Sequence, residues 1–282
     1  NPFLSLTLSD RFASLKEQHD VFLTAFLRAW YQASGNAFCA VSLESHGRQQ
    51  MDQWGISGMP VGWFTMHFPV VFELDPDRID LRLLRAKFLF DAGQGGVIRN
   101  PDRDAAFGQA LDDFRKVLAQ NDKIKEAWFW KASCLTQYGE YLRKDDRNPI
   151  PVWEEARDDF SRAISLDTSY AEGFIRRGGL LNHIAEYVGA KGGDPLPIWK
   201  DAEADIGRGI SLDGNYHVGP WLRGYTYYGR ANHDVKLGRD ATEDFRKALR
   251  DFEDASERSS DLKRKVADNI KRCREYLGKS PE

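Results

Sequence analysis

The amino-acid sequence predicts an all-α protein built as a solenoid of stacked antiparallel helix pairs. Two observations support this prediction: the sequence matches itself when it is shifted by 46 residues, and each copy contains two helical stripes of apolar residues. A single copy cannot bury both stripes, so neighbouring copies must stack on one another. The chain has 282 residues, of which 41% are hydrophobic, and this is enough to form a large core.

The 46-residue match runs through four copies. In each copy an aromatic residue is followed by an alanine three positions later and by an aspartate three positions after that. The residues in register are Phe107, Trp153, Trp199 and Phe245, then Ala110, Ala156, Ala202 and Ala248, then Asp113, Asp159, Asp205 and Asp251. Agreement at this many positions establishes the repeat.

A basic residue recurs once per copy in the same way, at Arg85, Lys131, Arg177 and Arg223. Because acidic and basic residues recur equally often, we predict a ladder of ion pairs between the two helices of each copy. If the pairs are exposed, each contributes only about 0–1 kcal/mol, and the ladder sets register rather than driving folding.

The second helix of each copy begins after a polar or proline-rich segment. Proline fixes its own backbone angle and disfavours helix in the residue before it, so residues 148–153 and 194–199 are predicted to be stiff extended connectors leading into helices. The second helix ends in a short turn such as Leu74-Asp75-Pro76, where the aspartate can cap the next helix.

Three regions follow from the strength of the repeat. Residues 1–60 are predicted to form an N-terminal helical cap and a degenerate first repeat. A weak helix pair is predicted at residues 20–33 and 62–74, upstream of the regular copies. Residues 61–256 form the repeat array. Residues 257–282 form a C-terminal capping helix and tail, with Leu262, Val266, Ile270, Cys273 and Leu277 on one face and basic residues on the other.

The small and apolar positions follow the order small–x23–Ala–x3–aromatic–x2–Ala–x4–Pro. In one copy these positions are Gly178, Ala202, Ile206, Gly209 and Gly214, and Pro76 supplies the proline in an earlier copy. The pattern resembles the tetratricopeptide repeat (TPR) family, whose unit is usually about 34 residues. The resemblance implies a right-handed TPR-like superhelix, with the extra residues in a longer first helix or an inserted loop.

Charge and motifs argue against several functions. The chain has 40 basic and 43 acidic residues, so no strong field favours nucleic acid or an anionic membrane. No phosphate-binding loop, nucleophile elbow or metal-ligand spacing is present, so we predict no enzyme activity, no cofactor and no metal site. An enzyme site among Glu44, His46, Asp52 and Trp54 is the disfavoured alternative.

The three cysteines, Cys39, Cys134 and Cys273, are widely spaced, which favours simple packing and a reducing compartment. A cytoplasmic location is therefore predicted. The chain begins with Asn1 rather than Met, and this is compatible with the removal of a leader or of a further domain.

The family resemblance implies that the first helices line a concave groove. Counted from the repeat pattern, the partner-binding residues would be Phe90, Phe129, Asn182, His183, Trp221, Tyr225 and Tyr228. For the aromatic residues, burial in the core is the alternative. We therefore predict a scaffold that binds a peptide or partner protein, but neither nucleic acid nor membrane, and leave homo-oligomers open. The alternative is a regulatory or assembly domain of a larger protein, for example one fused to a kinase or protease.

Overall fold

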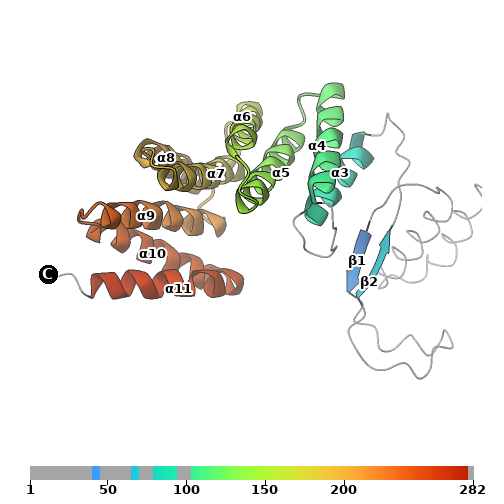
Figure 1. Ribbon diagram of the computed structural model, residues 1–282. Helices are drawn as coiled ribbons and strands as arrows, with labels where there is room; N and C mark the ends of the chain where they lie inside the picture. The colour runs from blue at the N-terminus through green and yellow to red at the C-terminus, as the bar shows by residue number, and fades with distance from the viewer. Residues whose placement is uncertain (1–39, 45–64, 70–78, 94–102, 279–282) are drawn as a thin grey trace, which may run out of the picture. The chain divides into compact units, whose positions relative to one another are not determined.

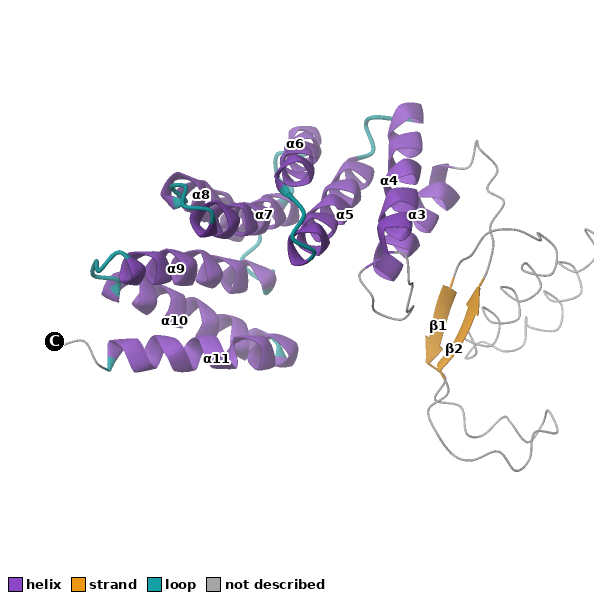
Figure 2. Ribbon diagram, in the orientation of Figure 1, coloured by secondary structure: helices purple, strands orange, loops and turns teal. Residues whose placement is uncertain are grey.

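The computed structural model describes residues 40–44, 65–69, 79–93 and 103–278 (Figure 1). The chain divides into two compact units, Asn1–Val117 and Leu118–Glu282. Figure 2 shows that the described part of the second unit is helical throughout apart from its connecting turns.

The first unit contains two strands, β1 (Ala40–Glu44) and β2 (Thr65–Pro69), and the helices α3 (Ile79–Gly93) and α4 (Arg103–Gln120), of which α4 runs across the unit boundary. The strands pair antiparallel, with Ala40 opposite Pro69 and Glu44 opposite Thr65. The helix predicted at residues 62–74 is therefore wrong where β2 lies. Thr65 and Phe68 favour a strand, and Pro69 cannot donate a helical hydrogen bond.

β1 also lies within residues 1–60, for which we predicted a helical cap. The helix predicted at residues 20–33 lies outside the described residues, as do His46, Asp52 and Trp54 of the disfavoured enzyme site.

The second unit is a stack of helix pairs, and it confirms the predicted all-α solenoid. Its helices are α5 (Lys125–Lys144), α6 (Ile150–Leu166), α7 (Ala171–Ala190), α8 (Leu196–Leu212), α9 (Val218–Lys236), α10 (Thr242–Arg258) and α11 (Ser260–Leu277). Each helix packs against the next one in the chain. α7 begins 46 residues after α5, α8 begins 46 residues after α6, and α10 begins 46 residues after α8. Because the connections are as short as residues 145–149 and 167–170, the extra length lies in the helices.

The proline-rich segments form helix starts, so the prediction of extended connectors is wrong. Pro149 and Pro195 have helical backbone angles at the N-caps of α6 and α8. Their missing N–H groups cost nothing there, because the first N–H groups of a helix have no partner within the helix. The preceding side chains add a second support: Asn148 and Asp194 accept hydrogen bonds from Ile150 N and Leu196 N, at 3.1 and 3.0 Å.

The predicted ion-pair ladder is confirmed. The shortest nitrogen–oxygen distances are 2.5 Å for Arg85–Asp113, 2.8 Å for Lys131–Asp159, 2.6 Å for Arg177–Asp205 and 2.7 Å for Arg223–Asp251. In each case the partners are 28 residues apart, on the first and second helices of one pair. Asp113, Asp159 and Asp251 are buried, with 0%, 6% and 3% of their side chains exposed, and 14% of the Asp205 side chain is exposed. The low value for exposed pairs therefore does not apply.

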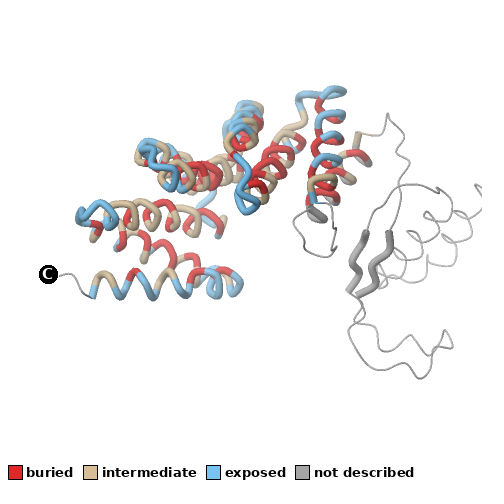
Figure 3. Tube along the Cα trace, viewed as in Figure 1, coloured by how far each residue is buried: buried red, intermediate tan, exposed pale blue. Residues whose placement is uncertain are grey.

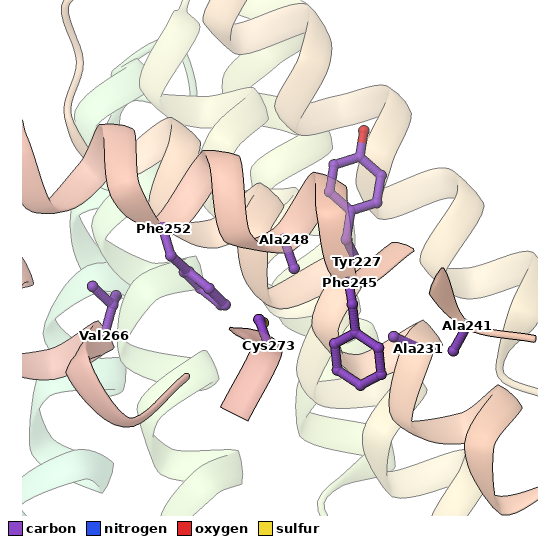
Figure 4. Packing of buried hydrophobic residues seen from close by; sticks show 8 residues of the cluster. All are labelled: Tyr227, Ala231, Ala241, Phe245, Ala248, Phe252, Val266 and Cys273. Atoms are coloured by element: carbon purple, nitrogen blue, oxygen red, sulfur yellow. The ribbon is translucent and has the colours of Figure 1, made fainter. Parts of the chain in front are cut away.

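The core of the second unit lies between the helices, whose buried faces point toward one another (Figure 3). Figure 4 shows the cluster around α9, α10 and α11, in which Phe245 and Phe252 are surrounded by small residues such as Ala231 and Ala248. Cys273 belongs to this cluster, and burial raises its pKa to about 12. Cys134 is also a buried cysteine outside any disulfide, so packing explains both of these cysteines.

α11 contributes the buried residues Val266 and Cys273 to this cluster, buries Leu262 as well, and exposes its basic residues. α11 packs on both α10 and α9. It therefore occupies the position that the first helix of a further pair would have. The charged face of α11 is suited to solvent, as expected for a capping helix.

Candidate protein-binding surface

The first helices of successive pairs in the second unit lie next to one another, α7 beside α9 and α9 beside α11. Two hydrogen bonds fix α7 to α9: Asn182 Nδ2 donates to the Leu222 carbonyl oxygen at 3.0 Å, and Thr226 Oγ1 donates to Asn182 Oδ1 at 2.9 Å. These bonds satisfy buried polar groups and so hold the two helices in one register. The result is a single layer of first helices that carries the candidate surface.

Three aromatic side chains form a stripe along α9 that we call the aromatic stripe: Trp221, Tyr225 and Tyr228. Their spacing of four and then three residues places them on one face of the helix. All three are half-buried. Tyr225 packs edge-on against Phe252 and Tyr228 packs edge-on against Phe245, with ring centroids 5.3 and 5.9 Å apart. The core therefore fixes the orientation of these rings while part of each remains accessible.

A group of charged residues from α5 and α7, which we call the charged cluster, lies on the α7 side of the stripe: Glu140, Arg143, His183 and Glu186. Glu140 Oε1 is 3.1 Å from His183 Nδ1, and Glu140 Oε2 accepts a hydrogen bond from Arg143 Nη2 at 2.8 Å. Burial raises the pKa of Glu140, but the hydrogen bonds from His183 and Arg143 outweigh it and bring the pKa down to about 2. Glu140 is therefore a firmly ionised group between two helices.

Glu186 belongs to the same cluster but has a different environment. Desolvation by the surrounding protein raises its pKa, whereas His183 and Arg143 act to lower it. The residue is nevertheless solvent-accessible. Its charge also acts on Tyr225, whose pKa is raised mainly by burial. Glu186 is therefore an accessible carboxylate near the aromatic stripe.

The sequence-predicted residues divide into two groups in the structure. Phe90, Phe129 and Asn182 are buried, and Phe129 packs against Phe160 with ring centroids 5.7 Å apart. His183, with 36% of its side chain exposed, and the three residues of the aromatic stripe remain accessible. Only this second group has surface to offer to a partner.

Sequence reasoning found His183 but missed the other three residues of the charged cluster, although a signal was available for the two glutamates. The dipeptides Glu140-Tyr141 and Glu186-Tyr187 are 46 residues apart, so the two glutamates occupy equivalent positions on α5 and α7. Following the equivalent positions to the ends of the first helices would have added both glutamates to the candidate surface.

The low pKa of Glu140 gives a prediction about acid stability. A folded-state pKa near 2, below the ordinary value of 4.5, means that ionised Glu140 stabilises the fold above about pH 4.5 and that this contribution is lost as the pH falls toward 2. Glu140→Gln should lower the free energy of unfolding by about 1–3 kcal/mol at pH 7, and the difference from wild type should shrink steadily below pH 4.5.

Urea unfolding at pH 7, 5, 4 and 3 measures this difference. The matched control is Asp158→Asn, because the Asp158 side chain is 76% exposed. A difference between wild type and Glu140→Gln that is the same at all four pH values would contradict the assignment.

The described residues show no metal-binding group of three or more His, Cys, Asp or Glu side chains. Within the same residues, no helix combines the length and the apolar character required to cross a bilayer.

Comparison with known proteins gives limited matches. No family model matches the chain. Surfactin synthase subunit 1 of Bacillus subtilis (strain 168) is 28% identical over 144 residues, covering 47% of this chain and 4% of that protein. Linear gramicidin synthase subunits C and B of Brevibacillus parabrevis are 35% and 34% identical over 60 and 59 residues, each covering 21% of this chain and 1% of that protein. The chain thus spans only a small part of the curated relatives it matches.

Two solved structures of MamA align with 65% of this chain at 19% identity, with TM-scores of 0.42 and 0.40, and the alignments cover 78% and 83% of the MamA chains. TM-scores this low indicate only a loose likeness between the two backbones. The helical repeat fold is established by the helices themselves and by their packing.

Proposed function

We propose that the chain is a protein-interaction scaffold that binds a peptide or a partner protein on the face formed by its first helices. The observation that carries the proposal is the aromatic stripe, which is fixed in orientation by the core and still half-exposed. Rigid, partly exposed Trp and Tyr side chains are typical anchors in protein interfaces. The charged cluster beside the stripe adds groups that select a partner by charge.

The proposal extends to the family: the helix pairs are TPR units lengthened to 46 residues. Packing at the small positions of the pattern supports this. A Cβ atom at Gly178 would lie 2.9 Å from the Ala202 carbonyl oxygen and would clash with Ile206. The first and second helices therefore approach most closely where the repeat pattern requires small residues. A cytoplasmic location stays a prediction.

Reversing one charge on this face tests the scaffold function without removing any core side chain. Glu186→Arg changes an accessible residue beside the aromatic stripe, and Glu154→Arg makes the same change at an exposed position on α6. A partner captured from native lysate and then purified should bind Glu186→Arg at least about tenfold more weakly than wild type, and should bind Glu154→Arg as wild type. Equal binding to all three proteins would place the interface elsewhere and contradict the proposal.

A second candidate function is supported by the comparisons. The matched relatives are very long synthase subunits, of which this chain covers 4% or less, and this favours a regulatory or assembly domain of a larger multidomain protein. An antibody raised against residues 118–282 would test it on a denaturing gel of native extract. The fused-domain function predicts a polypeptide far larger than 32.2 kDa, whereas a single band near that mass would contradict it.

A further inference from the structure

A group of polar side chains joins α9 to the second helices α8 and α10, and we call it the charged clamp: Glu203 on α8, Tyr227 and Arg230 on α9, and Asp244 on α10. Arg230 donates hydrogen bonds to both carboxylates, from Nη1 to Glu203 Oε2 at 2.9 Å and from Nη2 to Asp244 Oδ1 at 2.6 Å. The Tyr227 hydroxyl donates to Glu203 Oε1 at 2.9 Å. The two bonds to Glu203 therefore connect the α7–α8 pair to the α9–α10 pair.

The preceding copy of the repeat uses a different chemistry at the same positions. At an interval of 46 residues upstream, the four clamp positions hold Arg157, Leu181, Ile184 and Ile198. Leu181 and Ile184 are buried apolar side chains, whereas the residues that replace them on α9 are a tyrosine and an arginine. The junction before α9 thus has hydrogen-bonded charges where the junction before α7 has aliphatic side chains.

The apolar core is divided at the same junction. The helices α9, α10 and α11 share the buried cluster that Figure 4 shows, and in that view the Tyr227 hydroxyl points away from the cluster. The buried apolar contact between α7–α8 and α9 is a separate, smaller cluster of Ile175, Ile206 and Val218. The last pair and the capping helix therefore have a core of their own and can move as one body.

Water and salt reach the charged clamp. The exposed fractions are 35% for the Glu203 side chain, 20% for Arg230 and 14% for Asp244. Mobile ions screen the attraction between partly exposed charges, whereas the packing of aliphatic side chains is not screened. Because Arg230 pairs with both carboxylates, screening or removing it leaves two like charges close together without their shared cation.

We propose that α9–α11 open from α5–α8 as one body, and that the charged clamp makes this opening sensitive to salt. In a stack whose pairs contact only their neighbours, a weak junction divides the array into parts that open separately. Opening also breaks the two hydrogen bonds that join Asn182 to α9, so it alters the face that carries the aromatic stripe and the charged cluster. The proposal concerns the stack itself and does not depend on the scaffold function.

Hydrogen exchange of the full chain, followed by mass spectrometry of peptides from each helix, tests the proposal. The two conditions are about 0.1 M and about 1 M NaCl, between which the Debye length falls from about 10 to about 3 Å. In wild type the amides of α9–α11 should exchange together, and their exchange should become about fivefold faster at the higher salt concentration. The amides of α5 and α6 should change by less than about twofold.

Two variants assign the effect to the charged clamp. Arg230→Met should make the exchange of α9–α11 about tenfold faster or more at the lower salt concentration. Its matched control, Arg250→Met, makes the same change at an exposed position on α10 and should exchange as wild type. A four-residue variant installs the residues of the preceding copy and should abolish the salt dependence of α9–α11: Glu203→Arg/Tyr227→Leu/Arg230→Ile/Asp244→Ile.

Two results would overturn the proposal. Exchange of α5–α8 and α9–α11 at one common rate under both salt conditions would show that no separate body exists. Exchange of α9–α11 that depends equally on salt in wild type and in the four-residue variant would exclude the charged clamp as the cause. If Arg230→Met does not fold, the comparison of wild type with the four-residue variant still decides between these results.

Discussion

Replacing Lys131 by methionine is expected to lower the free energy of unfolding by about 3 kcal/mol. Only 8% of the Lys131 side chain and 6% of the Asp159 side chain are exposed, and their charged atoms are 2.8 Å apart. Methionine preserves most of the packing but leaves the Asp159 carboxylate buried without this cation. Desolvation of an uncompensated charge is then the dominant cost.

Two further variants separate the charge from the packing. Lys125→Met breaks the Lys125–Asp167 pair, in which 26% and 32% of the side chains are exposed, and should cost less than about 1 kcal/mol. Lys131→Met/Asp159→Leu removes both buried charges and should recover most of the loss. Urea unfolding followed by circular dichroism measures all three. If Lys131→Met and Lys125→Met lowered the free energy of unfolding equally, burial of the ladder would not be the cause of its contribution to stability.

The second large effect is expected from alanine at Gly209, a position on α8 that faces α7. A Cβ atom there would lie 2.7 Å from the Ala171 carbonyl oxygen and would also clash with Ile175. Backbone cannot move aside as a flexible side chain can, so the two helices must separate. We expect Gly209→Ala to lower the free energy of unfolding by about 1–3 kcal/mol despite the better helix propensity of alanine.

Gly207 provides a matched control two residues earlier in the same helix. A Cβ atom at Gly207 meets no other atom within 4 Å. Gly207→Ala should therefore raise the free energy of unfolding by about 0.5–1 kcal/mol, because alanine loses less backbone entropy in a helix. Thermal unfolding of the two variants gives melting temperatures on opposite sides of wild type. A shift in the same direction for both would contradict the close approach of α7 and α8 at Gly209.

The regular part of the fold was predictable because the repeat supplies several independent observations of each position. Ala202, Ile206 and Gly209 could be placed on a buried helical face because their equivalents obey the same pattern in other copies. The ion-pair partners followed from the same logic. Burial of these pairs was not predictable, because it depends on how close the two helices of a pair come.

The candidate surface was only partly predictable. Counting along the repeat placed Phe129 and Tyr225 in one class, but Phe129 is covered by Phe160 and Tyr170, whereas Tyr225 keeps an accessible part. Which aromatic residue is covered depends on neighbours in other helices, which a single repeat pattern does not specify. The strand at Thr65–Pro69 was missed for a related reason: the repeat is weakest there, and no second copy corrected the helical interpretation.

The constant 28-residue separation within the ladder has a consequence for how such a chain changes length. Each aspartate of the ladder in the second unit has a cation from its own helix pair as its ion-pair partner. Duplicating or deleting one 46-residue segment would therefore add or remove a complete acid–base couple, and no buried charge would be stranded. The gain or loss of a whole repeat therefore leaves the net charge of the core unchanged. The number of repeats can change in evolution while each helix pair keeps its own ion pair.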